Sequence, residues 1–205
     1  MKPHLEERGL LKKVKKKKIK ISPLLKQALR QAKSSHKNQK RDDGSSYLLE
    51  YIYPVACDIL NCGKNCNEKM LATALLHDVL EDDPKMDAKK FKNLFGIKIY
   101  NCVKILTKNK KDNSPGSSEK RKREINRNLI KKLEKKNRCT KLVKLADRTN
   151  NLASFSLPAV NKKKLERYLK ETKEFIIPFA KRENEYSYKK LTETYDRLSR
   201  GEDFK

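Results

Sequence analysis

Apolar residues recur along most of this chain at intervals of three and four, which places them on one face of an α-helix. The first clear helix begins at Ser22 and Pro23, a side-chain cap followed by a proline. A short helix is predicted between Asp87 and Gly96, and longer ones over residues 47–60, 67–81, 97–107, 118–138, 141–152, 160–182 and 183–198. No strand-length alternating run stands out, so the sequence predicts an all-α fold, an irregular helical bundle.

The length and the distribution of lysines indicate one domain with tails. A chain of 205 residues is the size of a single domain. The lysine block before residue 21 has no apolar face, so we expect residues 1–21 to form a basic, mobile tail. Residues 22–199 then form the domain, and residues 200–205 a polar C-terminal tail.

The net charge of +26 has two interpretations. The simpler one is a lysine-rich composition that covers solvated faces and has no specific partner. The functional one is attraction to polyanions, because a positive field concentrates a nucleotide that carries several phosphates. Such a surface would also bind nucleic acid without sequence preference.

Membrane insertion and disulfide bonding are not indicated. No apolar run approaches the length of a membrane span, and no signal-peptide core follows Met1. The five cysteines are an odd number, which favours reduced thiols in a cytoplasmic protein. Cys62 and Cys66 lie close together, but no second Cys/His pair follows at zinc-finger spacing, so we interpret them as part of a loop.

The most informative stretch is a cluster of polar residues at the end of the apolar helix over residues 67–81. His77 and Asp78 are adjacent, and Glu81 and Asp82 follow one helical turn later. Carboxylates on an otherwise apolar helix need a cation or solvent. The cluster is therefore either part of a metal site or a solvated acidic turn that ends the helix.

A second apolar helix favours the metal site. Residues 141–152 carry an inward-facing Asp147, with Asn151 one turn later. An apolar helix rarely buries a lone aspartate without a partner. Two such helices can together build a divalent-metal site with nitrogen and oxygen ligands.

These two stretches resemble the HD-domain guanosine polyphosphate hydrolases, the hydrolase half of RelA/SpoT-type enzymes and the free-standing small alarmone hydrolases. The resemblance extends over residues 22–182, roughly, and includes several shorter matches in the same order. These are Arg41, the turn from Gly44 to Tyr47, Val55 with Ala56, and residues 171–180.

The resemblance implies an HD-domain helical bundle that removes the 3′-diphosphate from guanosine tetra- or pentaphosphate with Mn²⁺. His77, Asp78 and Asp147 would bind the ion, and Glu81 and Asp82 would orient and deprotonate the attacking water. The guanosine polyphosphate would be held by Arg41, Asn151 and Ser154.

The chain departs from the family pattern at Tyr51, where the family has a metal-binding histidine. A phenol has a pKa near 10 and is a poor neutral ligand beside an imidazole. The ion could be held by the three remaining ligands and water, Tyr51 could coordinate as a phenolate, or the site could be empty. Three hypotheses follow: an active hydrolase, an impaired relative that binds guanosine polyphosphate or another polyanion without turnover, and an HD-fold protein acting on another phosphate ester or on nucleic acid.

Overall fold

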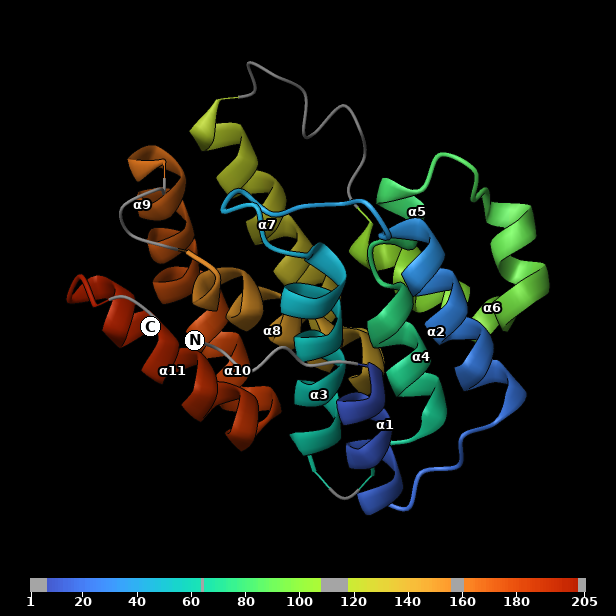
Figure 1. The fold of residues 1–205 in the computed structure, drawn as a ribbon. Helices are drawn as coiled ribbons and strands as arrows, with labels where there is room; N and C mark the ends of the chain where they lie inside the picture. The colour runs from blue at the N-terminus through green and yellow to red at the C-terminus, as the bar shows by residue number, and fades with distance from the viewer. Residues whose placement is uncertain (1–6, 64, 108–117, 156–160, 203–205) are drawn as a thin grey trace. The chain divides into compact units, whose positions relative to one another are not determined.

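The computed structural model describes residues 7–63, 65–107, 118–155 and 161–202. These residues form helices joined by turns, with one isolated antiparallel bridge between Lys40 and Ser46 and no β-strand among them. The prediction of an all-α fold is confirmed. The chain divides into two compact units, Met1–Thr107 and Lys108–Lys205, and each is described by itself (Figure 1). None of the described helices is both long and apolar enough to cross a bilayer.

Among its described residues, the first unit, coloured blue to green in Figure 1, holds seven helical elements. They are α1 (Glu7–Lys16), α2 (Pro23–Ser35), the π-helical turn η1 (Leu48–Ile52), α3 (Tyr53–Asn61), α4 (Glu68–Leu76), α5 (Val79–Asp82) and α6 (Ala88–Leu106). Its helix α2 packs on α4, α3 packs on both α4 and α1, and α6 packs on α4 and α5. The side chains of Leu25, Ile52, Leu71, Leu75 and Phe91 are fully buried between them.

The prediction of a mobile tail over residues 1–21 is wrong for the part that the structure describes. Residues 7–16 form α1, which packs on α3 and buries Leu10 and Val14 to 2% exposure each. These two apolar residues lie four apart, so they share one face of a helix even inside a block of lysines. Residues 1–6 lie outside the described residues, as do residues 203–205 of the predicted C-terminal tail.

Two predicted helices are interrupted where a proline follows. In the predicted helix over residues 47–60, η1 precedes Pro54, and the Tyr53 amide donates to the Leu48 carbonyl, five residues back. A proline has no amide hydrogen and its ring clashes with the carbonyl four residues earlier. A widened π-turn relieves that clash without ending the helix. In the second unit, residues Thr172–Ile176 form the same kind of π-turn before Pro178.

Gly96 and Ser22 behave as the sequence predicts. Ser22 caps α2 by accepting a hydrogen bond from the Leu25 amide at 3.3 Å. Asp87 caps α6, and Gly96 interrupts that helix with φ 79° and ψ 160°. A positive φ of this size is accessible to glycine without strain. The two predicted helices are therefore separated at Gly96, and the label α6 covers both of them.

The second unit, coloured yellow-green to red, is built around α8. Helix α8 packs on α7, α10 and α11, and α9 packs on α7. Leu142, Leu145, Phe179 and Leu191 are fully buried in its core. Asparagine or serine side chains cap α7, α8, α9 and α11. The elements are α7 (Glu119–Glu134), α8 (Arg138–Ala153), α9 (Lys162–Glu171), the π-helical turn η3 (Thr172–Ile176), α10 (Ile177–Glu183) and α11 (Glu185–Ser199).

Candidate functional site

The His77–Asp78 pair lies at a break between two helices of the first unit. The predicted helix over residues 67–81 is not continuous, because α4 ends at Leu76 and α5 begins at Val79. Ala74 is in the last turn of α4, where carbonyls lack a helical partner. Its carbonyl oxygen lies 2.8 Å from Nδ1 of His77, whose side chain is 2% exposed. A carbonyl only accepts, so Nδ1 carries the hydrogen and Nε2 presents a lone pair.

Two tyrosine hydroxyls contact the side-chain atoms of His77 and Asp78 that, by the resemblance, would bind a metal. Tyr51 Oη is 3.2 Å from Nε2 of His77, and with the hydrogen on Nδ1 the hydroxyl is the donor. Tyr47 donates to Oδ2 of Asp78 at 2.6 Å. The same Oδ2 lies 3.4 Å from Nε2 of His77, so the two candidate ligand atoms are neighbours.

Arg41 lies beside these two tyrosines. Its guanidinium carbon is 4.7 Å from the centre of the Tyr51 ring and 5.7 Å from that of Tyr47. The loop that carries Arg41 is tied by the bridge between Lys40 and Ser46 and turns at Gly44, which has φ 80°. A cation over an aromatic face is attracted by the ring quadrupole. The loop thus holds a positive charge against the two tyrosines that contact the His77–Asp78 pair.

Glu81 and Asp82 lie in α5, immediately after that pair. The Asp82 carboxylate accepts a hydrogen bond from the Gln39 amide at 3.0 Å. The other end of that amide contacts Nδ1 of the fully buried His36 at 2.6 Å. Burial raises the pKa of Asp82, and the negative charge of Asp78 raises this pKa further. A carboxylate with a raised pKa is a stronger base, which suits proton abstraction.

The donor atoms of the first unit fit a divalent metal in part. A neutral imidazole nitrogen and a carboxylate oxygen are ordinary ligands of Mn²⁺ and similar ions. The hydroxyl of Tyr51 lies on the nitrogen lone pair, so a cation there requires that hydroxyl to move or to lose its proton. Across the described ranges, no group of three or more His, Cys, Asp and Glu side chains is arranged to hold an ion. The first unit therefore supplies two donors.

The remaining predicted residues lie on α8 or, for Ser154, at its C-terminal cap, in the second unit. Asp147 accepts hydrogen bonds on both oxygens, from Lys144 at 2.7 Å and from the side-chain amide of Asn151. Ser154 donates to the backbone carbonyl of Asn151 at 2.7 Å. The inward-facing aspartate expected from the sequence thus has a lysine and an amide as partners, and the Asp147 side chain is 14% exposed.

A basic cavity lies next to Asp147 and Asn151. Its volume is about 470 Å³, and first turns of α7 and α9 contribute to its wall. Two acidic side chains, Glu119 and Asp147, line it. The basic side chains that line it are Lys122, Lys144, Lys163, Lys164, Arg148 and Arg167. The excess of positive charge and the two helix N-termini favour an anion in this space.

The structure adds residues that the sequence argument missed. Tyr47 contacts Asp78, and Gln39 contacts Asp82. Lys144 is the ion-pair partner of Asp147. Tyr47 could have been identified from its spacing to Tyr51, because residues four apart share a helix face. Gln39 is a loop residue 43 positions from Asp82, and no local pattern links the two.

A comparison with family models matches residues 28–184 to the HD domain. A probable guanosine-3′,5′-bis(diphosphate) 3′-pyrophosphohydrolase of Synechocystis is 32% identical over 147 residues, 72% of this chain and 18% of that protein. The bifunctional (p)ppGpp synthase/hydrolase SpoT of Escherichia coli is 31% identical over 158 residues, 77% of this chain and 21% of that protein. The chain thus spans about a fifth of the length of these relatives.

A solved structure shares the fold. It is described as a metazoan ortholog of SpoT that hydrolyzes ppGpp and plays a role in starvation responses. The TM-score is 0.71, with 22% identity, and the match covers 87% of this chain and 97% of that one.

Proposed function

We propose that this chain, which belongs to the HD domain family, is a hydrolase that removes the 3′-diphosphate from guanosine tetra- or pentaphosphate, with Mn²⁺ as its metal. HD-domain hydrolases are metal-dependent. The relative from Synechocystis is named for this reaction, and the relative from Escherichia coli is named as a (p)ppGpp synthase/hydrolase. The observation that carries the proposal is the His77–Asp78 pair. Its imidazole is buried and held in the tautomer that leaves Nε2 free of hydrogen, beside a carboxylate.

In this proposal the metal ligands are His77, Asp78 and Asp147, carried over from the family resemblance. A bound metal would polarise the scissile phosphate and acidify a water. Asp82, with its raised pKa, would accept the proton, and Glu81 would orient the water.

Nucleotide binding would come from Arg41, Asn151 and Ser154. Arg41 is held against two tyrosine rings, so its guanidinium is positioned before substrate arrives. Asn151 lines the basic cavity, whose positive charge would attract the phosphates of the same substrate.

The test is release of pyrophosphate from guanosine tetraphosphate in the presence of Mn²⁺. We expect turnover by the natural protein and none by Asp78→Ala. Asp83→Ala is the matched control, because Asp83 lies nearby but contacts Ser35 and Gln31 and has no assigned role. We expect Tyr51→His to bind Mn²⁺ more tightly, which calorimetry would measure separately from activity.

Two results would change the conclusion. If the natural protein is silent and Tyr51→His is active, the chain is an impaired hydrolase, and its role is at most to bind guanosine polyphosphate. If the natural protein and every variant are silent although circular dichroism shows them folded, the proposed reaction is wrong.

A further inference from the structure

A segment near the N-terminus, residues 8–41, has a charge distribution that overall composition does not explain. Residues 8–41 contain 14 Lys and Arg residues and no Asp or Glu. The chain has 26 acidic residues in 205, so an even distribution would place about four of them in this stretch. A general lysine bias would add basic residues here but would not remove the acidic ones.

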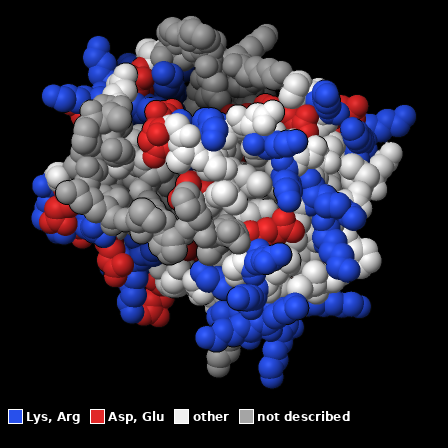
Figure 2. Space-filling model, viewed as in Figure 1, with Lys and Arg blue, Asp and Glu red and all other residues white. Residues whose placement is uncertain are grey.

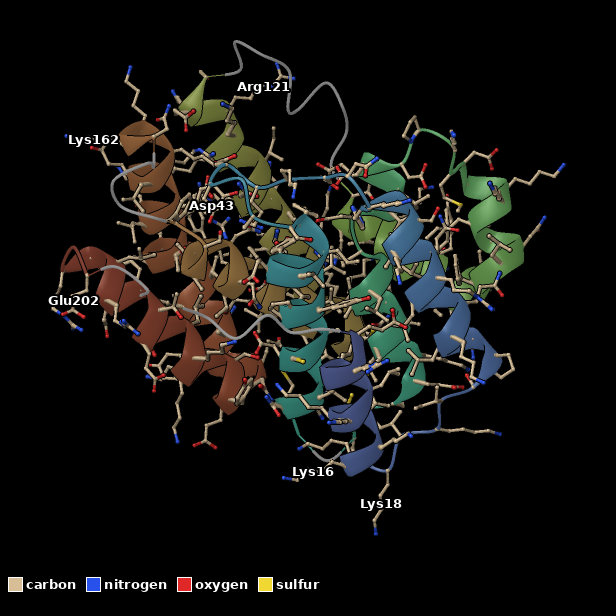
Figure 3. The ribbon with its side chains drawn as sticks, in the orientation of Figure 1. Lys16, Lys18, Asp43, Arg121, Lys162 and Glu202 are labelled. Carbon is tan, nitrogen blue, oxygen red and sulfur yellow. The ribbon has the colours of Figure 1, made fainter. Side chains whose placement is uncertain are left out.

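The fold places the basic side chains of this stretch on the outside of the first unit. The apolar residues of α1 and α2 face inward, with Leu10, Val14, Leu25 and Leu29 buried. The basic residues face outward, and all of them except Arg41 are classed as exposed. In Figure 2 blue side chains gather where α1 and its following turn lie, and Figure 3 shows Lys16 and Lys18 pointing away from the ribbon. We call the exposed Lys and Arg of residues 8–40 the N-terminal basic surface.

We propose that the N-terminal basic surface is a docking site for double-stranded nucleic acid, which it contacts through the phosphate backbone without reading sequence. Lysines predominate over arginines in the stretch, and lysine binds phosphate as a point charge. Arginine has the planar fork that suits bidentate recognition, so a surface rich in lysine favours contact with phosphates over readout of bases. The surface lies outside the residues assigned to hydrolysis, so this role is additional to the proposed reaction.

Two other polyanions fit the surface less well. A helix that lies in a membrane interface needs an exposed apolar face. Leu10 and Val14 of α1 are buried on α3, and the large apolar side chain exposed among the described residues is Ile97, in α6. Single-stranded nucleic acid is bound largely by stacking bases on aromatic rings. Residues 8–41 contain no Phe, Tyr or Trp.

The experiment compares two variants of the full chain that have the same net charge. In the first, Lys12, Lys13, Lys16 and Lys17 on α1 and its following turn are each changed to Gln. In the control, four exposed lysines elsewhere in the first unit are changed to Gln: Lys69, Lys85, Lys89 and Lys98. Fluorescence anisotropy measures the affinity for a short labelled duplex of arbitrary sequence over a range of salt concentrations.

Each neutralised duplex phosphate adds about 0.9 to the slope of log affinity against log salt. We expect the α1 variant to lose about 2 to 4 from this slope and about tenfold or more in affinity near physiological salt. The control should keep its slope to within about 1. Both variants should retain the natural circular dichroism spectrum, because the substituted side chains are exposed.

Three outcomes would overturn the proposal. Equal weakening in the two variants would mean that net charge, and not this surface, attracts the duplex. Tighter binding to a single strand of the same sequence would assign the surface to unpaired nucleic acid. Tighter binding to phosphatidylserine vesicles, lost with the same four α1 lysines, would assign it to membranes. Pyrophosphate release by the α1 variant is measured separately. It should equal that of the natural protein whether or not the surface binds a duplex, because none of the four lysines is assigned to hydrolysis.

Discussion

Glu171 should be among the residues on which the stability of the second unit most depends. Its side chain has 0% exposure and accepts hydrogen bonds from Arg148 at 2.9 Å, Arg167 at 3.2 Å and Asn126 at 3.0 Å. The Arg148 side chain is itself only 4% exposed. The substitution Glu171→Ala would leave two guanidinium groups facing each other without the carboxylate that lies between them.

Breaking a buried ion pair by removing one partner costs about 3–5 kcal/mol, because the remaining charge stays buried. For a chain of this length, such a loss lowers the melting temperature by roughly 6–20 °C. Urea unfolding followed by circular dichroism measures the free energy directly. The matched control is Glu134→Ala, whose pair with Arg182 at 2.6 Å is about half exposed on both sides. An exposed pair contributes about 0–1 kcal/mol. If the two substitutions cost the same, or if Glu171→Ala costs less than about 1 kcal/mol, the reasoning is wrong.

Three further predictions concern the first unit. Tyr47→Phe removes the hydroxyl that donates to Asp78, and the free energy of unfolding should fall by about 1–3 kcal/mol in a urea titration. Asp82→Asn should stabilise the fold at neutral pH: the raised pKa of Asp82 means that its ionised form is disfavoured in the folded state. The gain in stability should vanish below the ordinary pKa of 3.8, where Asp82 and the asparagine that replaces it are both neutral. A difference in stability between the two proteins that does not change with pH would contradict the raised pKa of Asp82. Burial, and then the charge of Glu7, raise the pKa of Tyr53 to about 12. Stability should therefore fall between pH 10 and pH 12 and should fall less in Tyr53→Phe, which unfolding curves at alkaline pH would show.

The fold class and several helix ends could be predicted because they depend on local chemistry. The cap at Ser22 and the interruption at Gly96 depend on one side chain or one backbone conformation, and the structure confirms both. Helix α1 was missed because the count of lysines hid the spacing of Leu10 and Val14. Burial of those two residues depends on α3, a helix more than 35 positions later in the chain, which local periodicity does not report.

The candidate site was predictable in its residue types and less so in its contacts. The spacing of His77 and Asp78 is visible in the sequence, but the break that frees the Ala74 carbonyl is not. The position of the Tyr51 hydroxyl on His77 depends on how one helix packs against another. Such long-range hydrogen bonds are set by tertiary packing, which overrides the periodic pattern of either helix alone.

The π-helical turn η1 changes the direction in which side chains point from the helix axis, between the residues before it and those of α3. Residues before Pro54 pack against α2, and residues after it pack against α4 and α1. The extra residue in the widened turn rotates the later side chains by about 100° relative to a regular helix. Pro54, in the first turn of α3, holds this offset in place. The direction in which Tyr47 and Tyr51 face relative to the side chains of α3 is thus set by Pro54, through its missing amide hydrogen and the clash of its ring.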